Sequence, residues 1–410
     1  MRGFTHVVRP RAIPDLCAGR WRGDLSRLPT SWPVGPSTLS GVRVLCVGGA
    51  RPNFMKVKPV MDGLLARDAE VVLVHTGQHY DLDMSEVFLS ELGIRPPDHH
   101  LGVGSASQAT QTARVMEAFE PLVAETRPDV VVVVGDVNST AACALVAAKS
   151  GSLVAHVEAG LRSRDWSMPE EVNRVITDRV SDYLFAPSPD AADNLRVEGY
   201  RPDQIHVVGN VMVDSLLANL DAARRRPVLR QHGLGERGYG LVTLHRPANV
   251  DDRAVLDPLL GALVQLSLQL PLVFPVHPRA RGAITEVLSV LKGCVLLLPP
   301  AGYLDFIALE AGARLVLTDS GGVQEETTVL GVPCLTLREN TERPITVTEG
   351  TNRVVGRDPA RILMEAQRVL DEGVPPRRPA LWDGCAGQRI AEVIVAGGGP
   401  VGHPRPTDSP

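Results

Sequence analysis

The sequence predicts an α/β protein built from two Rossmann-like domains that face each other across a cleft. The chain has 410 residues, which is more than one domain usually holds. Short apolar runs alternate with helical patterns along most of its length, and this alternation is typical of parallel sheets covered by helices on both faces. Polar segments, several of them rich in glycine, follow the apolar runs in both halves, where such sheets bind their ligands.

Composition and charge narrow the functional classes. Hydrophobic residues make up 44% and charged residues 22% of the chain, which is ordinary for a soluble globular protein. No uncharged apolar run approaches the roughly 20 residues that a membrane span needs, so we expect no membrane-embedded part. The net charge of -5 provides no basic surface for nucleic acid. The six cysteines are scattered without a CxxC pair, which argues against a metal site and favours a cytoplasmic location.

The two ends differ from the rest of the chain. Residues 1–40 are rich in arginine and contain five prolines that interrupt helices and strands, so we expect a disordered N-terminal extension. Residues 397–410 begin with three glycines and a proline, and we expect a disordered tail there.

The first domain is expected at 41–210, joined by a C-terminal helix at 376–396. Each apolar run is short enough for a buried strand, and the all-valine run suits a strand that is covered on both faces. The expected strands are Val42–Val47, Glu70–His75, Val130–Val134, Leu153–Val157, Tyr183–Ala186 and Ile205–Val208, with helices such as Gln108–Glu125, Ser139–Lys149 and Glu170–Ser181 between them.

The second domain is expected at 211–375. A change of composition at 221–240, rich in arginine and glycine, lies near the join of the two halves. Its expected strands are Leu241–Leu244, Leu272–Val276, Val295–Leu298, Leu315–Leu317 and Cys334–Leu337.

Polar residues follow the first apolar runs. The turn after the first run contains glycines and Arg51, and the helix start there favours an anion, although an ordinary strand-to-helix turn fits this segment equally well. Asp136 follows the valine run, where an acid often only caps the next helix. Strand alternation places His156 and Glu158 on one face, which suggests a tuned acid/base or an ion pair with Arg162.

Three carboxylates are expected at one edge of the first sheet. Glu170 lies in the first turn of a predicted helix, where acids usually interact with the helix dipole. Asp136, Glu158 and Glu170 together are more than the structure requires at that edge, so they are candidates for acid/base chemistry.

The second half offers matching polar segments. His245 follows one apolar run and His277 the next, while Ser320 opens a glycine turn before a helix. Backbone N–H groups and the serine hydroxyl at such a turn suit phosphate, and Glu326 in the helix suits ribose hydroxyls, although a plain capping serine fits as well. Arg343 adds an anion-binding side chain.

Other candidate sites have weaker support. His75 and His79 are four residues apart, but a strand ends between them, so helical metal ligation is not favoured. His99-His100 lies near two prolines and is expected in a solvated loop. The serines lack the GxSxG pattern of a nucleophile elbow.

Several longer motifs follow one another along the chain. They are Gly-Ala-Arg-Pro (49–52) with Lys56, Thr-Gly-Gln-His (76–79), Gly-Asp-Val-Asn-Ser-Thr (135–140), His-Val-Glu-Ala-Gly-Leu-Arg (156–162), Pro-Glu-Glu-Val-Asn-Arg (169–174), Thr-Leu-His-Arg-Pro (243–247), Asp-Ser-Gly-Gly-Val-Gln-Glu-Glu (319–326) and Thr-Glu-Arg-Pro (341–344). In this order they resemble the motifs of the non-hydrolysing UDP-N-acetylglucosamine 2-epimerases. The resemblance extends from about Val42 to beyond Gly356 and so covers nearly all of the chain that is expected to be ordered.

The resemblance implies a glycosyltransferase-B-like fold, a UDP-sugar substrate in the cleft and a homodimer. It also implies a reaction without cofactor or metal that interconverts UDP-N-acetylglucosamine and UDP-N-acetylmannosamine. In the family scheme the C2 proton is removed as UDP leaves C1, and the 2-acetamidoglucal then regains a proton on its other face and UDP at C1.

The resemblance also assigns residues to the site. Matching motif positions make Asp136, Glu158, Glu170 and His245 the acid/base and sugar-contacting residues. The positions that match the family's substrate and UDP contacts are Arg51, Lys56, His277, Phe306, Ser320, Gly321, Gly322, Glu326 and Arg343.

Departures from the family pattern leave the substrate and its regulation open. Asn53 stands where some members have glutamate, and the uracil-contacting glutamine of some members is absent near Pro299. Gln78 and His79 match the region where many bacterial members bind a second UDP-sugar as activator, but the residues after them differ. Four alternatives remain: a 2-epimerase of a modified sugar such as a 2,3-diacetamido-glucuronate nucleotide, a hydrolysing epimerase that releases UDP and N-acetylmannosamine, a glycosyltransferase, and an inactive UDP-sugar sensor.

Overall fold

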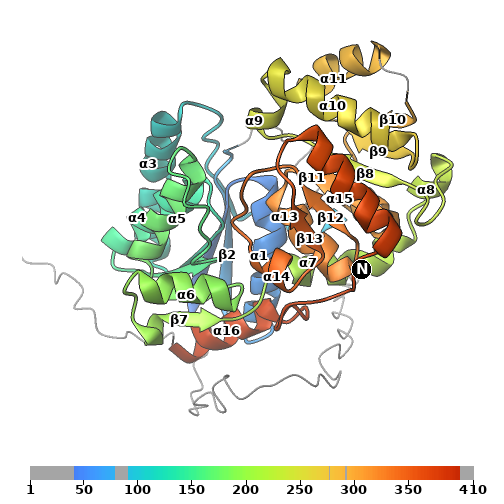
Figure 1. Cartoon of the computed structure of the whole chain (residues 1–410). Helices are drawn as coiled ribbons and strands as arrows, with labels where there is room; N and C mark the ends of the chain where they lie inside the picture. The colour runs from blue at the N-terminus through green and yellow to red at the C-terminus, as the bar shows by residue number, and fades with distance from the viewer. Residues whose placement is uncertain (1–40, 79–90, 277, 291–292, 398–410) are drawn as a thin grey trace, which may run out of the picture. The chain divides into compact units, whose positions relative to one another are not determined.

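A computed structural model describes residues 41–78, 91–276, 278–290 and 293–397. The expected disorder of 1–40 and 398–410, together with the residues His79 and His277, falls outside these ranges. The described residues form two parallel sheets flanked by helices, coloured blue to green and yellow to red in Figure 1. None of the described helices is long and apolar enough to cross a membrane.

The first sheet has seven parallel strands in the order β3-β2-β1-β4-β5-β6-β7. Its central strand β4 is five buried valines, as a strand with helices on both faces requires. The strands are β1 (Arg43–Gly48), β2 (Glu70–His75), β3 (His99–His100), β4 (Val130–Val134), β5 (Leu153–Val157), β6 (Tyr183–Ala186) and β7 (Ile205–Val207).

The second sheet has six parallel strands in the order β10-β9-β8-β11-β12-β13. Its strands are β8 (Gly240–Thr243), β9 (Leu272–Pro275), β10 (Val295–Leu298), β11 (Leu315–Thr318), β12 (Cys334–Thr336) and β13 (Asn352–Val354).

Helices connect the strands and cover both sheets. Those of the first half are α1 (Arg51–Leu65), α3 (Gln108–Thr126), α4 (Asn138–Lys149), α5 (Pro169–Val180) and α6 (Pro189–Val197), with a 3₁₀ turn at Pro202–Gln204. Those that follow are α7 (Val211–Arg224), α8 (Val228–Gln231), α9 (Pro247–Val250), α10 (Arg253–Ser267), α11 (Pro278–Val290), α12 (Tyr303–Gly312), α13 (Gly321–Leu330), α14 (Ile345–Thr348), α15 (Pro359–Glu372) and α16 (Ala386–Gly397).

Each face of the first sheet packs against its own set of helices and forms a separate part of the hydrophobic core. One face of the first sheet packs on α3 and α4, and the other packs on α1. The C-terminal helix α16 returns to the first half and packs closely on α1, because glycines at Gly63 and Gly387 let the two backbones approach. Helix α7 contacts α1 on one side and α12 on the other, so it connects the two halves. The domain limits expected from the sequence stay predictions.

The expected loop at His99-His100 is wrong, although the expected exposure to solvent holds for His100. These residues form β3, which pairs with the end of β2, and the ring of His100 stacks on that of His75 at 4.6 Å between centroids. Burial beside this second imidazole lowers the pKa of His75 to about 4, so His75 is neutral at physiological pH.

Candidate active site

The strand order places two candidate loops side by side in each sheet. The chain reverses its direction of progress across the sheet between β1 and β4, and again between β8 and β11. At such a switch point the loops after the two strands diverge to opposite faces and leave room for a ligand. The residues that follow these strands are Gly49 and Asp136 in the first half and His245 and Asp319 in the second.

A buried ion pair lies at the first switch point. Nζ of Lys56, from α1, is 2.5 Å from Oε2 of Glu158, and both side chains are at most one-tenth exposed. The second oxygen of Glu158 has no hydrogen-bond partner among the described residues. Gly135 follows β4 beside this pair with φ of 69°, and a Cβ there would lie 3.1 Å from the Lys56 ammonium. The glycine therefore lets the backbone pass close to the charge.

The predicted shared face of His156 and Glu158 is wrong. His156 is fully buried, where its ring lies 2.6 Å from Asp178 and 2.9 Å from the carbonyl oxygen of Gly135. Glu158 has φ of 73°, which breaks the strand alternation and directs its side chain to Lys56 on the α1 side.

The suggested Arg162–Glu158 pair is also absent from the described contacts. Arg162 instead lies 2.6 Å from Glu198 and 2.7 Å from Asp178. These contacts make Arg162 part of a buried structural network that includes the charge of Asp178.

Asp136 does not cap the next helix. The N-cap of α4 is Val137, and the carboxylate of Asp136 instead lies 2.5 Å from Nη2 of Arg174 on α5. Burial would raise the pKa of Asp136, but the charges of Arg174, Lys56 and Arg343 outweigh it, so the pKa lies below its ordinary value. Asp136 is therefore an ionised carboxylate that keeps about a quarter of its side-chain exposure, 26%.

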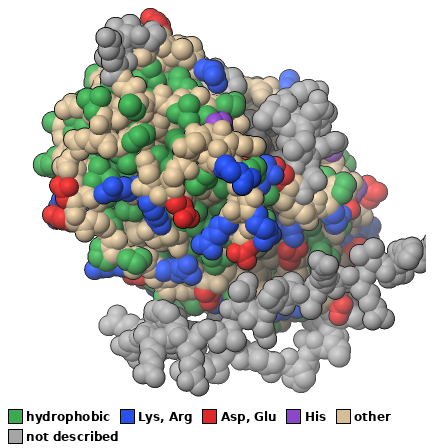
Figure 2. Space-filling model, turned by 90° about the vertical axis from the view of Figure 1, so that its right-hand side faces the viewer, with side chains coloured by type: hydrophobic (Ala, Val, Ile, Leu, Met, Phe, Trp, Pro, Cys, Tyr) green, Lys and Arg blue, Asp and Glu red, His purple; other side chains and the backbone are tan. Residues whose placement is uncertain are grey.

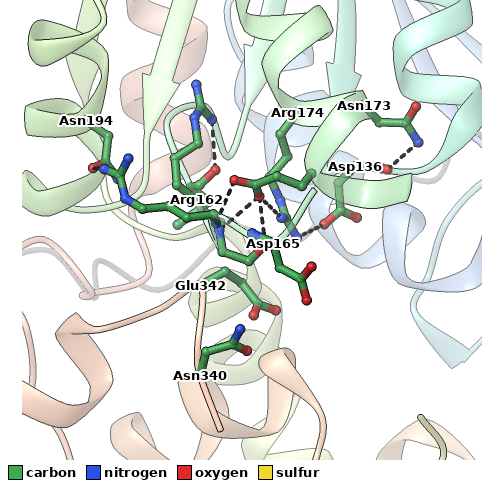
Figure 3. A network of polar contacts seen from close by, with 12 residues as sticks. Asp136, Arg162, Asp165, Asn173, Arg174, Asn194, Asn340 and Glu342 are labelled. Atoms are coloured by element: carbon green, nitrogen blue, oxygen red, sulfur yellow. Dashed lines mark hydrogen bonds and ion pairs between the residues drawn. The ribbon is translucent and has the colours of Figure 1, made fainter. Parts of the chain in front are cut away.

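Helix α5 positions Asp136 through residues that we did not single out from the sequence. The side-chain amide of Asn173 donates to the backbone oxygen of Asp136 at 2.9 Å, while Glu171 holds the guanidinium of Arg174 at 2.7 Å. Figure 3 shows the contact between Arg174 and Asp136, with Asn173 on the other side of Asp136. The candidate Glu170 is half-buried and makes no hydrogen bond or ion pair that the described residues reveal, so the structure does not join it to the cluster.

The second switch point holds a histidine and a buried aspartate. Nδ1 of His245 is 2.9 Å from Oδ1 of Asp319, and the imidazole is 56% exposed while the carboxylate is fully buried. Burial would raise the pKa of Asp319, but the hydrogen bonds from His245 and from the N–H groups of His245 and Arg246 lower it below its ordinary value. Asp319 therefore stays ionised and orients His245.

The glycine-rich start of α13 lies against an arginine. A Cβ on Gly321 would lie 2.4 Å from Nη1 of Arg343 and 2.8 Å from Oε1 of Glu342, so a larger residue would require this buried ion pair to move. The hydroxyl of Ser320 does not cap α13, although Ser320 is its N-cap residue. Gly322 follows on the same turn, so the expected phosphate-binding segment has an uncapped helix start with a cation beside it.

Arg343 connects the two halves electrostatically. Its guanidinium lies 2.6 Å from Glu325 and 2.8 Å from Glu342, and all three side chains are buried. The charges of Asp136 and Glu158 also act on Arg343 and help to raise its pKa against the effect of burial. The residues that follow the two sheets thus form one charged cluster.

Glu342 is surrounded by guanidinium groups. Arg338 lies 2.9 Å away and Arg246 3.4 Å, in addition to Arg343. Burial would raise the pKa of Glu342, but these cations and Arg174 from the first half hold it far below its ordinary value. Figure 3 shows Glu342 on the side of the network opposite Arg174.

On the face shown in Figure 2, basic side chains lie among acidic ones.

Glu326 and Phe306 lie on neighbouring helices. Glu326 is 5% exposed on α13, and its Oε1 has no hydrogen-bond partner among the described residues. Phe306 is half-buried on α12 and packs against the core. The sequence did not single out Glu310, which is fully buried on α12 beside Glu326.

The remaining residues expected to bind the substrate are either outside the described part of the structure or bonded to other protein groups. Arg51 begins α1, but its side chain, like His79 and His277, is outside what the structure describes. The N–H groups of Gly49 and Ala50, expected to favour an anion, both donate to the side chain of Asn53. Gln78 is buried and accepts hydrogen bonds from the N–H and hydroxyl of Ser139 on α4.

Comparison with known proteins identifies the relatives of the chain. A family model described as UDP-N-acetylglucosamine 2-epimerase matches residues 64–395. A protein of that name from Methanococcus maripaludis is 39% identical, with 84% of this chain and 96% of the relative covered. The UDP-2,3-diacetamido-2,3-dideoxy-D-glucuronate 2-epimerase of Pseudomonas aeruginosa is 40% identical, with 86% and 99% covered.

Solved structures agree with the predicted fold class. The UDP-GlcNAc 2-epimerase of Methanocaldococcus jannaschii, solved in complex with UDP-GlcNAc and UDP, superposes with a TM-score of 0.80 at 38% identity, and the match covers 86% of this chain and 99% of that one. A sucrose-phosphate synthase from Thermosynechococcus elongatus, at 15% identity and a TM-score of 0.56 over 86% and 94% of the two chains, shares the fold alone. The expected glycosyltransferase-B-like architecture is confirmed.

Proposed function

The chain belongs to the UDP-N-acetylglucosamine 2-epimerase family, and we propose that it interconverts UDP-N-acetylglucosamine and UDP-N-acetylmannosamine without a cofactor and without releasing free sugar. Family membership makes it an isomerase. The observation that carries the proposal for its mechanism is the placement of acid/base side chains at both switch points, Asp136 and Glu158 after one sheet and His245 after the other.

Inversion at C2 requires proton transfer on two opposite faces of one carbon. A single base on one face returns the proton where it was removed, so a second group must act from the other side. Asp136 and Glu158 belong to the first half, whereas His245 belongs to the second. This separation supports removal of the proton by a group of one half and its return by a group of the other.

The C2 proton is weakly acidic, so its removal requires cleavage of the C1–O bond at the same time. The leaving UDP gains negative charge as this bond breaks, and fixed cations at that point lower the barrier. Arg343 beside the open start of α13, together with Lys56 from α1, supplies such cations. The product of elimination is a 2-acetamidoglucal, to which UDP adds again at C1 after C2 is protonated.

Asp319 gives His245 a defined role in this scheme. A carboxylate that accepts a hydrogen bond from Nδ1 fixes the tautomer and leaves Nε2 for the substrate. Glu170 has no such support, and of the four acid/base residues expected from the family it is the one without a described partner. We assign the proton transfers to Asp136, Glu158 and His245.

Incubation of the purified protein with UDP-N-acetylglucosamine in D₂O, without added nucleotide cofactor or metal, tests the proposal by proton NMR. We expect the C2 proton signal to disappear while UDP-N-acetylmannosamine accumulates. Free N-acetylmannosamine with UDP would instead identify a hydrolysing epimerase. Epimerisation without deuterium incorporation at C2 would contradict the elimination mechanism.

A second substrate has comparable support from the comparisons. The relative from Pseudomonas aeruginosa, whose name specifies a 2,3-diacetamido-glucuronate nucleotide, is as similar to this chain as the N-acetylglucosamine enzymes. If the first substrate shows no exchange, the same NMR experiment with the diacetamido nucleotide decides between the two. A homodimer stays a prediction from the family resemblance.

A further inference from the structure

Two buried glutamates lie in contact behind the proposed ribose site. Glu310 on α12 is fully buried and Glu326 on α13 is 5% exposed. Their carboxyl groups are close enough to share a hydrogen bond when one of them carries a proton. The mechanism proposed above uses Glu326 for ribose but gives Glu310 no function.

Glu310 has no other group that would stabilise a negative charge. Neither of its oxygens has a hydrogen-bond donor among the described residues, and no described Lys or Arg forms an ion pair with it. An ionised carboxylate buried in this way costs several kcal/mol, more than its protonation does. Burial and the neighbouring Glu326 accordingly raise the pKa of Glu310 well above its ordinary value. Burial and the charge of Glu325 also raise the pKa of Glu326, to about 8, while the hydrogen bond from Glu310 lowers it, so Glu326 is the first of the two to ionise.

The other titratable groups near the pair do not change this conclusion. Tyr303 on α12, Tyr239 before β8 and Cys334 on β12 are neutral at physiological pH, because burial raises the pKa of all three. Glu325, next to Glu326 on α13, is paired with Arg343, so that cation is already engaged.

We propose that Glu310 is a neutral carboxylic acid that donates a hydrogen bond to Glu326 and thereby holds the Glu326 carboxyl group in position for the ribose hydroxyls of a uridine nucleotide. This inference rests on the proposed function, because it takes Glu326 as the ribose contact. A protonated Glu310 uses its single donor on one oxygen of Glu326. Oε1 of Glu326 is fully buried and has no other partner among the described residues, so we assign this hydrogen bond to Oε1, and Oε2 is left for the ligand. Glu310 is therefore a positioning residue for nucleotide binding.

Two substitutions of Glu310 separate this role from simple packing. Glu310→Gln keeps a neutral donor of the same shape, whereas Glu310→Met keeps the length but removes the donor. Loss of this buried hydrogen bond leaves Glu326 unsatisfied, so we expect Glu310→Met to weaken UDP binding by about tenfold and Glu310→Gln to keep affinity within about threefold of the unmutated protein. Titration calorimetry with UDP measures both, and Glu349→Gln, an exposed acid on the loop after α14, is the control.

Stability should fall together with affinity. Glu310→Met removes the donor and leaves the buried Glu326 carboxyl group unsatisfied, so this variant should also unfold at a lower temperature, whereas Glu310→Gln keeps a donor and should stay close to the unmutated protein. If Glu310 acted only in packing, the two variants would not differ in affinity. Glu310→Met should also reduce the preference for UDP over 2′,3′-dideoxyuridine diphosphate, since only UDP has the hydroxyls that Glu326 would accept.

A double-mutant cycle with Glu326→Gln completes the test. We expect Glu310→Met to have no further effect on UDP affinity once Glu326 is replaced. Additive losses, equal losses for Glu310→Gln and Glu310→Met, or an unchanged UDP affinity in Glu310→Met would each overturn the inference while the proposed function stands. Absence of UDP binding by the unmutated protein would overturn both. If Glu310→Met fails to fold, infrared spectroscopy decides: the band of a protonated carboxyl at neutral pH must weaken in Glu310→Gln, and an unchanged band overturns the inference.

Discussion

Replacement of Lys56 by methionine should separate the structural and catalytic contributions of the buried ion pair. Methionine keeps most of the aliphatic stem and removes the ammonium group, so Glu158 loses the cation 2.5 Å from its Oε2. Breaking a buried pair from one side typically costs about 3–5 kcal/mol. The charge of Arg343 also acts on Glu158, so we expect the lower end, about 3 kcal/mol.

The expected loss is measurable by thermal unfolding. For a chain of 410 residues, with an unfolding entropy of about 2.1 cal/mol/K per residue, a change of about 3 kcal/mol corresponds to roughly 3–4 °C in the midpoint. Lys58→Met is a matched control, because Lys58 lies on the same helix and forms an i,i+4 pair with the half-exposed Asp62. Such a surface pair contributes about 0–1 kcal/mol, so the control should unfold close to the unmutated protein.

The double variant with Glu158→Gln tests the catalytic role of the same pair. Removing both charges should recover most of the lost stability, since no buried charge is then left alone. Turnover should stay lost, because the carboxylate is absent. A midpoint within about 1 °C of the unmutated protein for Lys56→Met, at a ratio of about 1.2 °C per kcal/mol, would refute the stability argument. Recovery of turnover in the double variant would refute the assignment of Glu158 to proton transfer.

Three further predictions concern other groups of the site and the core. Asp136→Asn and His245→Asn should each lower turnover by about 10²–10⁴-fold with UDP binding retained, and near-normal rates in both would contradict the site assignment. Asp319→Asn should cause a similar loss of turnover because it removes the acceptor for Nδ1 of His245; an equal loss of UDP affinity by calorimetry would indicate general disruption instead. Burial raises the pKa of Asp214, which accepts the first N–H groups of α16, to about 6. The native state therefore holds this proton more tightly than the unfolded chain, and the stabilisation present below about pH 4 is lost as pH rises to about 6. Relative to Asp214→Asn, which does not titrate, the unmutated protein should lose about 3 kcal/mol over this interval in urea unfolding, and a constant difference would contradict the argument.

The sequence predicted the architecture well because its signals are local. Apolar runs predicted both ends of the central strands to within one residue, and Val130–Val134 matches β4 at both ends. The two strands that were missed, His99–His100 and Asn352–Val354, are two and three residues long, lie at sheet edges and contain polar residues. Neither length nor composition distinguishes such a segment from a loop, because pairing with a neighbour alone makes it a strand.

The sequence predicted which loops form the site. It did not predict which side chains contact one another there. Polar residues after apolar runs are identifiable because strand ends of a parallel sheet share an edge. The partner of Asp136, however, is Arg174, 38 residues away, and that of His245 is Asp319, 74 residues away. The sequence contains no signal that predicts contact between an acid and a base so far apart, because each of them alone also fits a helix turn or a glycine loop.

Glu158 shows why an alternation rule fails next to a functional site. Continued alternation would put its carboxylate on the face of His156, where Asp178 already lies against the imidazole and a second buried anion would be repelled. The left-handed conformation of Glu158 costs about 1–2 kcal/mol for a residue with a Cβ. The contact with Lys56 offsets this cost. In this conformation the carboxylate lies on the side of the sheet where Gly135, which has no Cβ, leaves room for the ion pair. One unfavourable dihedral angle therefore separates a histidine of the core from a carboxylate of the site, although the two residues are only two positions apart in the sequence.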